Sequence, residues 1–170
     1  MWGFMIICYT FMLFNSVNLF ITGLSGYFQF NIFGADHTRF ALFTILIFII
    51  TETIVMYFFI STGKGIKEAL GKELGETILW DQEKKLKRKL FPQLMLTIFL
   101  VCTVFILGGA VDTQTSFAWL HGPLFLLAFF HHLWTLLVKN NSFKEQIAII
   151  LSVGGNFTGT CASKIMNDLG

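Results

Sequence analysis

Long apolar stretches alternate with shorter polar ones along the whole chain. A helix that crosses a membrane needs about 20 mostly apolar residues. Four stretches meet this requirement, at residues 3–24, 40–60, 90–111 and 118–138. The polar segments between them are two short connections and one long one, residues 61–89. This pattern predicts an all-α integral membrane protein, folded as an antiparallel four-helix transmembrane bundle.

Positive charge is concentrated in the long connection between the second and third stretches. It holds most of the 12 Lys and Arg residues, whereas the two short connections hold only Arg39. Connections rich in Lys and Arg stay on the cytoplasmic side of a membrane. We therefore expect a multi-pass protein of a bacterial inner or organellar inner membrane, with the N-terminus and the C-terminus both on the cytoplasmic side. The first stretch lacks a basic leader and a cleavage site, which favours a retained span.

The long connection and the tail both carry helical patterns. Ile66, Leu70, Leu74 and Ile78 recur every four residues between charges, which predicts a helical cytoplasmic loop over residues 61–89. Its basic cluster KKLKRK enforces the topology or, alternatively, attracts anionic lipid. Residues 139–170 are predicted to be an amphipathic tail or a weak fifth segment, because their apolar part is interrupted by GGNFTGT.

Composition supports a lipid environment and excludes some partners. The chain is 55% hydrophobic and 13% charged, whereas soluble domains carry about 25% charged residues. Its net charge of +2 is too small to indicate nucleic acid binding. The three cysteines are not closely paired, which favours packing roles for Cys8, Cys102 and Cys161 over a disulfide framework or a zinc site.

Polar residues lie at similar depths in all four predicted spans. At 1.5 Å per residue, a shared layer near mid-membrane depth is formed by Asn15, Asn18, Glu52, Thr103, His131 and His132. Polar side chains at this depth usually face a partner or a cavity. The layer predicts a proton path through Glu52, Asn15, Asn18 and Thr103; the alternative is hydrogen bonding between helices without further function.

Glu52 and the two central histidines suggest a metal site or a proton relay. A carboxylate and two imidazoles, here Glu52, His131 and His132, are a common ligand set for iron, copper or zinc. Adjacent helical residues project about 100° apart, so only one of the two histidines would point at Glu52.

Haem is the other cofactor that the histidines suggest. Haem b with two imidazole ligands needs two histidines at equal depth on facing helices. Within this chain only His37 can pair with His121, whereas a haem at His131 or His132 would need a partner subunit. Asp36, His37, Asp112 and His121 are expected to converge between the two short connections. They would form a surface metal site or part of a quinone pocket, or else remain solvated loop residues.

The absence of known catalytic motifs limits the functional classes. No nucleophile elbow, zincin helix or dinucleotide fingerprint is present, which favours a non-catalytic or cofactor-holding subunit over an enzyme. The four-helix layout with histidines resembles the general plan of small cytochrome b-type anchors. We expect a subunit of a redox-linked, respiratory-type electron-transport complex that contributes haem, quinone or proton-path residues. Its expected partners are the lipid bilayer and other membrane subunits or further copies of itself. The alternatives are a small transporter or channel and a cofactor-free structural subunit.

Overall fold

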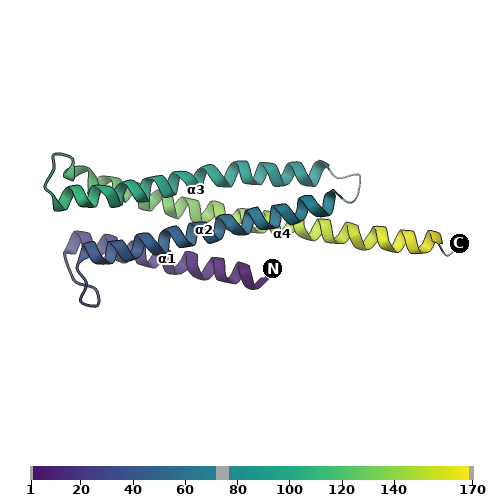
Figure 1. Cartoon of the computed structure of the whole chain (residues 1–170), viewed down its shortest axis with the longest axis horizontal. Coiled ribbons are helices and arrows are strands. Elements are labelled where there is room, and N and C mark those ends of the chain that lie inside the picture. The colour runs from purple at the N-terminus through teal and green to yellow at the C-terminus, as the bar shows by residue number, and fades with distance from the viewer. Residues whose placement is uncertain (1, 72–76, 169–170) are drawn as a thin grey trace.

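Four long helices make up nearly the whole chain (Figure 1). The computed structural model describes the backbone of residues 2–71 and 77–168 and the side chains of 3–71 and 78–154. The helices are α1 (Trp2–Phe28), α2 (His37–Leu70), α3 (Thr77–Asp112) and α4 (His121–Asp168), with a short 3-10 helix, η1 (Ala118–Leu120), before α4. All four long helices are long and apolar enough to cross a membrane. The prediction of an all-helical chain with four candidate spans is therefore confirmed.

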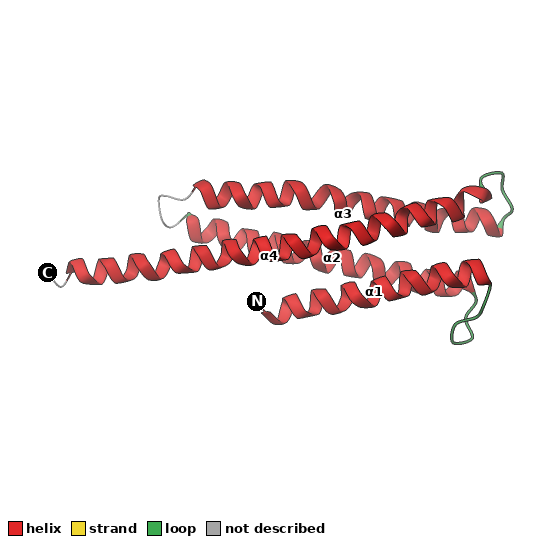
Figure 2. Ribbon diagram, turned by 180° about the vertical axis from the view of Figure 1, so that it is seen from behind, coloured by secondary structure: helices red, strands yellow, loops and turns green. Residues whose placement is uncertain are grey.

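The two ends of the bundle carry different segments. Residues 29–36 and 113–117 lie together at one end, which we call the loop end (Figure 1). The last turn of α2 and the lysine-rich start of α3 lie at the opposite end, which we call the basic end. Figure 2 shows α4 extending past the other helices at the basic end.

The helices are longer than the predicted spans. α2 continues to Leu70 and α3 begins at Thr77, so most of the predicted helical loop consists of two helical extensions; Leu74 lies outside the described residues. Pro92 lies inside α3, because that helix starts well before the predicted third span. α4 continues unbroken from the fourth span into the predicted tail.

The start of α2 also differs from the prediction, with a consequence for the site. We placed His37 and Arg39 in a loop, but they form the first turn of α2. The carboxylate of Asp36 accepts a hydrogen bond from the backbone N–H of Arg39 at 2.9 Å, an N-cap that starts the helix at His37. The cap thereby holds His37 on a rigid helix.

The bundle interior contains two separate hydrophobic clusters. The cluster nearer the basic end is larger and rich in aromatic rings, with Phe58, Phe59 and Phe143 packed at centroid distances of 5.0–5.3 Å. The cluster nearer the loop end consists of smaller side chains and Phe48, and it includes Leu19, Ile45, Val101, Val104 and Ala128. The second cluster forms part of the wall of a cavity.

Candidate functional site

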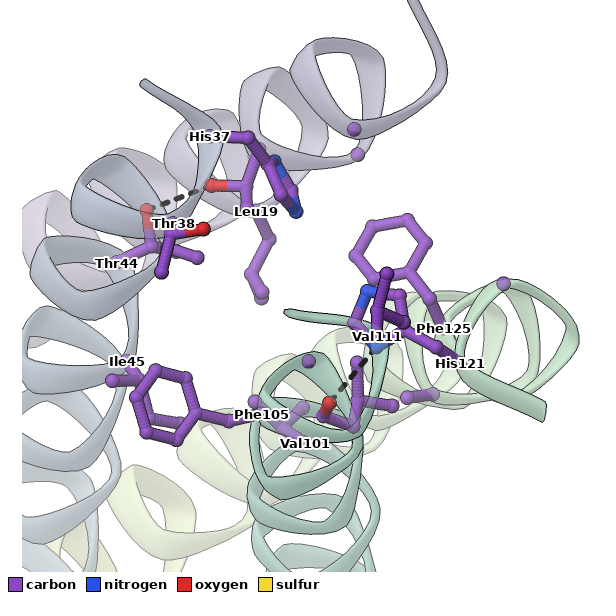
Figure 3. A pocket seen from close by; sticks show the side chains of 18 of the residues that line it. Leu19, His37, Thr38, Thr44, Ile45, Val101, Phe105, Val111, His121 and Phe125 are labelled. Atoms are coloured by element: carbon purple, nitrogen blue, oxygen red, sulfur yellow. Dashed lines mark hydrogen bonds between the residues drawn. The ribbon is translucent and has the colours of Figure 1, made fainter. Parts of the chain in front are cut away.

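A cavity of about 440 Å³ lies near the loop end, between residues of α1, α2, α3 and α4 (Figure 3). Its walls are mainly apolar, including Leu19, Ile45, Val101, Phe105 and Phe125. A few polar groups join them, among them Thr22, Thr44, Asp112 and two histidines. A volume of this size, apolar walls and few polar groups are typical of cofactor and small-molecule sites.

The two histidines at the cavity are His37 and His121. His37 is the first residue of α2 and His121 the first residue of α4, so both stand at helix starts (Figure 3). Their ring centroids are 6.4 Å apart and the ring planes cross at 79°. The structure thus places His37 next to His121, the pairing within one chain that the sequence analysis suggested.

The hydrogen bonding of His121 fixes which of its nitrogens is available. Its Nδ1 lies 3.1 Å from the backbone carbonyl oxygen of Val104. A carbonyl can only accept, so Nδ1 carries the hydrogen and the lone pair of a neutral ring is on Nε2. Metal-binding histidines commonly donate their other N–H to a backbone carbonyl in this way. His37 has a buried Nδ1 without a hydrogen-bond partner among the described residues.

Glycines of α1 make room for the aromatic side chains at the cavity. A Cβ at Gly26 would lie 2.9 Å from Cε1 of His37, closer than real Cβ atoms come, so a larger residue here would force the ring to shift. A Cβ at Gly23 would overlap the ring of Phe125. The positions of His37 and Phe125 therefore depend on the lack of a Cβ atom at Gly26 and Gly23.

Of the four residues considered for a site between the two short connections, three line the cavity: His37, Asp112 and His121. Asp36 instead caps α2 and lies 3.6 Å from the Nε of Arg39. The sequence analysis missed the roles of Gly23 and Gly26; their spacing of three within one predicted span was the only signal available for them.

The two central histidines have hydroxyl partners. His131 Nδ1 lies 2.9 Å from Thr97 Oγ1, and His132 Nε2 lies 3.2 Å from Ser16 Oγ. The His132 ring packs against Phe48 at a centroid distance of 5.9 Å. In the part of the chain that the structure describes, no group of three or more His, Cys, Asp or Glu residues could hold a metal ion. Glu52, His131 and His132 are thus not gathered into such a group, and the metal site suggested for them stays a prediction.

Glu52 has a different partner, which the sequence analysis missed. The ammonium of Lys139 donates to Glu52 Oε1 at 2.5 Å, and both side chains are buried. We placed Lys139 at the start of the tail, but α4 continues through it. The missed signal was its position seven residues after His132, which puts it on the same helix face.

The other residues of the predicted proton path are placed separately. Asn15 is fully buried, and neither polar atom of its side chain finds a partner within the described chain. Asn18 is buried and donates to the carbonyl of Phe14 in its own helix. Thr103 is only half-buried and its hydroxyl donates to the carbonyl of Phe99, also in its own helix.

Comparison of the chain with protein-family models, curated proteins and solved structures finds no match. The site must therefore be interpreted from its own geometry.

Proposed function

We propose that this chain is a multi-pass membrane subunit that carries electrons in a larger redox-linked complex, with haem b bound between His37 and His121. The supporting observation is the pair of imidazoles at one apolar cavity. In this proposal the helices cross a bacterial or organellar inner membrane as an antiparallel bundle. The basic end and both termini lie in the cytoplasm, because Lys and Arg cluster there.

The two imidazoles lie close enough to hold one group between them. The ring centroids of His37 and His121 are 6.4 Å apart. With haem bound, each of the two histidines would hold the iron through a ring nitrogen.

The surroundings also fit haem better than a bare metal ion. Haem brings four nitrogen ligands of its own, so the protein needs to supply only two. This agrees with a pair of histidines and with apolar walls for the macrocycle. The carbonyl of Val104 would orient His121 and increase its basicity, and burial would tune the iron potential. When bound, the haem would supply one-electron chemistry.

The absorption spectrum of the detergent-purified protein, from cells supplied with haem precursors, tests this proposal. The dithionite-reduced minus oxidised spectrum should show a sharp α-band. The band should be lost in His37→Gln and His121→Gln and kept in the matched control His131→Gln, since His131 bonds Thr97. Added imidazole should restore the band in His121→Gly, because it replaces the lost ligand without repairing a misfolded chain.

Two results would overturn the haem site. One is the absence of an α-band in wild-type protein from haem-supplied cells. The other is an unchanged band in the His37→Gln/His121→Gln double variant. Either result would favour the alternatives, a quinone pocket, a transporter or a structural subunit, and liposome flux would then separate the transporter from the rest.

A further inference from the structure

The buried face of α4 between the cavity and the basic end is polar where an apolar seam is expected. Five successive contact positions, spaced three and four residues apart, are all fully buried: His132, Thr135, Lys139, Ser142 and Gln146. Such spacing marks the seam between packed helices, which is normally filled with Leu, Ile or Val. We call these five residues the polar stripe.

The neighbouring helices meet the stripe with polar groups of their own. Ser16 of α1 contacts His132 at 3.2 Å, and Glu52 of α2 accepts from Lys139. Thr62 of α2 accepts from the side-chain amide of Gln146 at 3.1 Å. The stripe is therefore lined on several sides by groups that hydrogen-bond, over a length of about 21 Å from His132 to Gln146.

Further polar groups lie beyond both ends of the stripe. Toward the cavity, Thr22 and Thr44 bond each other at 2.8 Å and also line the cavity wall. Toward the basic end, fully buried Glu83 lies 3.0 Å from the ammonium of Lys87, whose side chain is 23% exposed. Lys87 and Glu83 press against Gly63, the residue after Thr62, where a Cβ would collide with both. The ammonium of Lys87 therefore lies beside Gly63, next to Thr62, which is the hydrogen-bond partner of Gln146. Lys87 connects the surface with this end of the stripe.

Several buried atoms along this line have no hydrogen-bond partner among the described residues. They are both polar atoms of the Asn15 side chain, Glu52 Oε2, Glu83 Oε2, His132 Nδ1, Ser142 Oγ and Gln146 Oε1. Leaving such an atom unpaired destabilises the folded protein. Buried polar groups of this kind bind internal water.

The spacing of these groups suits one or two bridging waters. Gln146 and Ser142 are separated by about 6 Å along the helix axis, and Ser142 and Lys139 by about 4.5 Å. One water with two hydrogen bonds of about 2.8 Å can span the shorter gap, and two waters can span the longer one. Between Lys139 and His132 the stripe continues through Thr135, which bonds Thr97 of α3 at 2.9 Å, while Glu52 pairs with Lys139.

We propose that the polar stripe holds a file of water molecules and conducts protons between Lys87–Glu83 and the cavity, with the Glu52–Lys139 pair as its central relay. A proton moves from Lys139 Nζ to Glu52 as an N–H bond breaks and an O–H bond forms, which leaves a neutral pair. The carboxyl group of Glu52 then turns, which carries the proton away from Lys139, and Glu52 gives this proton to water on the His132 side. Lys139 takes a proton from water on the Ser142 side. One proton has then crossed, and the ion pair is restored.

This inference goes beyond the proposed electron transfer and does not depend on haem. It rests on the stripe, the ion pair and the unpartnered atoms. The absorption spectrum tests the haem site, whereas proton flux tests the stripe. Failure of one therefore leaves the other standing.

Proton flux into liposomes tests the proposal directly. The full-length protein is reconstituted into phospholipid vesicles containing the pH indicator pyranine, and a potassium diffusion potential with valinomycin drives protons inward. We expect acidification faster than in protein-free vesicles. We expect it to fall to the protein-free rate in the double variant Glu52→Gln/Lys139→Gln. The control Thr53→Val, next to Glu52, should conduct like wild type, because the exposed Thr53 donates to Ile49 in its own helix.

The double variant separates conduction from stability. Replacing Glu52 alone would leave a buried charge without its partner and could unfold the protein. Two glutamines keep a hydrogen bond between the helices but cannot relay a proton through an acid and a base. If the double variant unfolds in a thermal melt, Ser142→Ala, which removes a water ligand from the path, replaces it and should also reduce flux. Wild-type flux no faster than in protein-free vesicles, or full flux in the folded double variant, overturns the proposal.

Discussion

The four helices pack differently in the half of the bundle near the loop end, which we call the loop half, and in the half near the basic end, which we call the basic half. In the loop half, α1 carries Gly23 and Gly26 at its contacts, the hydrophobic cluster is small, and a cavity remains. In the basic half, the rings of Phe58, Phe59 and Phe143 fill the interior beside the polar stripe. The loop half thus leaves space for a ligand, whereas the basic half supplies most of the close packing.

This difference implies a division between stability and function. Protein interiors owe their stability to dense contacts, because each atom pair contributes little and many pairs contribute much. The aromatic cluster should therefore hold the bundle together even when the cavity is altered. Side-chain changes at the cavity should affect ligand binding more than folding.

The largest predicted effect comes from truncating a ring in the basic half, compared with truncating one in the loop half. Phe58 is 1% exposed and contacts the rings of Phe4, Phe59 and Phe143. Phe58→Ala should lower the free energy of unfolding by about 3 kcal/mol, the lower end of the usual range, because lipid replaces water around separated helices. Phe105, which lines the cavity and is 38% exposed, is the matched control.

Denaturation of both variants in mixed detergent, followed by circular dichroism, measures this contrast. Phe105→Ala should cost about 1 kcal/mol or less, since it enlarges an existing space and removes few contacts. Equal losses for the two variants would show that the cavity wall is as tightly packed as the aromatic cluster. The division between the halves would then be wrong.

A smaller effect is expected from two glycine-to-alanine changes. Gly26→Ala forces the His37 ring to move, because the new Cβ would lie 2.9 Å from Cε1. It should reduce the haem bound per protein at nearly unchanged stability. Gly65→Ala, in α2, meets nothing within 4 Å and should stabilise the protein by about 0.5–1 kcal/mol through helix propensity. Haem content and melting temperature of both variants separate ligand positioning from a general effect of the methyl group.

Hydrophobic periodicity and length were sufficient to predict the helices, but not their full extents. A span predicted from hydrophobicity ends where polar residues begin. The helices α2 and α4, however, continue beyond that point. Lys139 was assigned to the tail for this reason, and its pairing with Glu52 was missed. Distances between helices cannot be read from one sequence either. The pairing of His37 with His121 followed only because these two histidines had equal predicted depth, while the cavity and its glycines depend on helix packing.

The smallest predicted effect compares hydroxyl pairs at the cavity and at the centre. Thr22 and Thr44 bond at 2.8 Å where they line the cavity. Thr97 and Thr135 bond at 2.9 Å, and Thr97 also contacts His131. Hydrogen bonds between membrane helices average about 0.6 kcal/mol, because separated helices find other partners. A hydroxyl at a cavity can also be solvated by water in the native state. Double-mutant cycles with valine should therefore give a coupling energy below this average for Thr22–Thr44 and at or above it for Thr97–Thr135.

The reverse order would mean that the cavity excludes water, and a dry cavity would separate the polar stripe from the histidine pair.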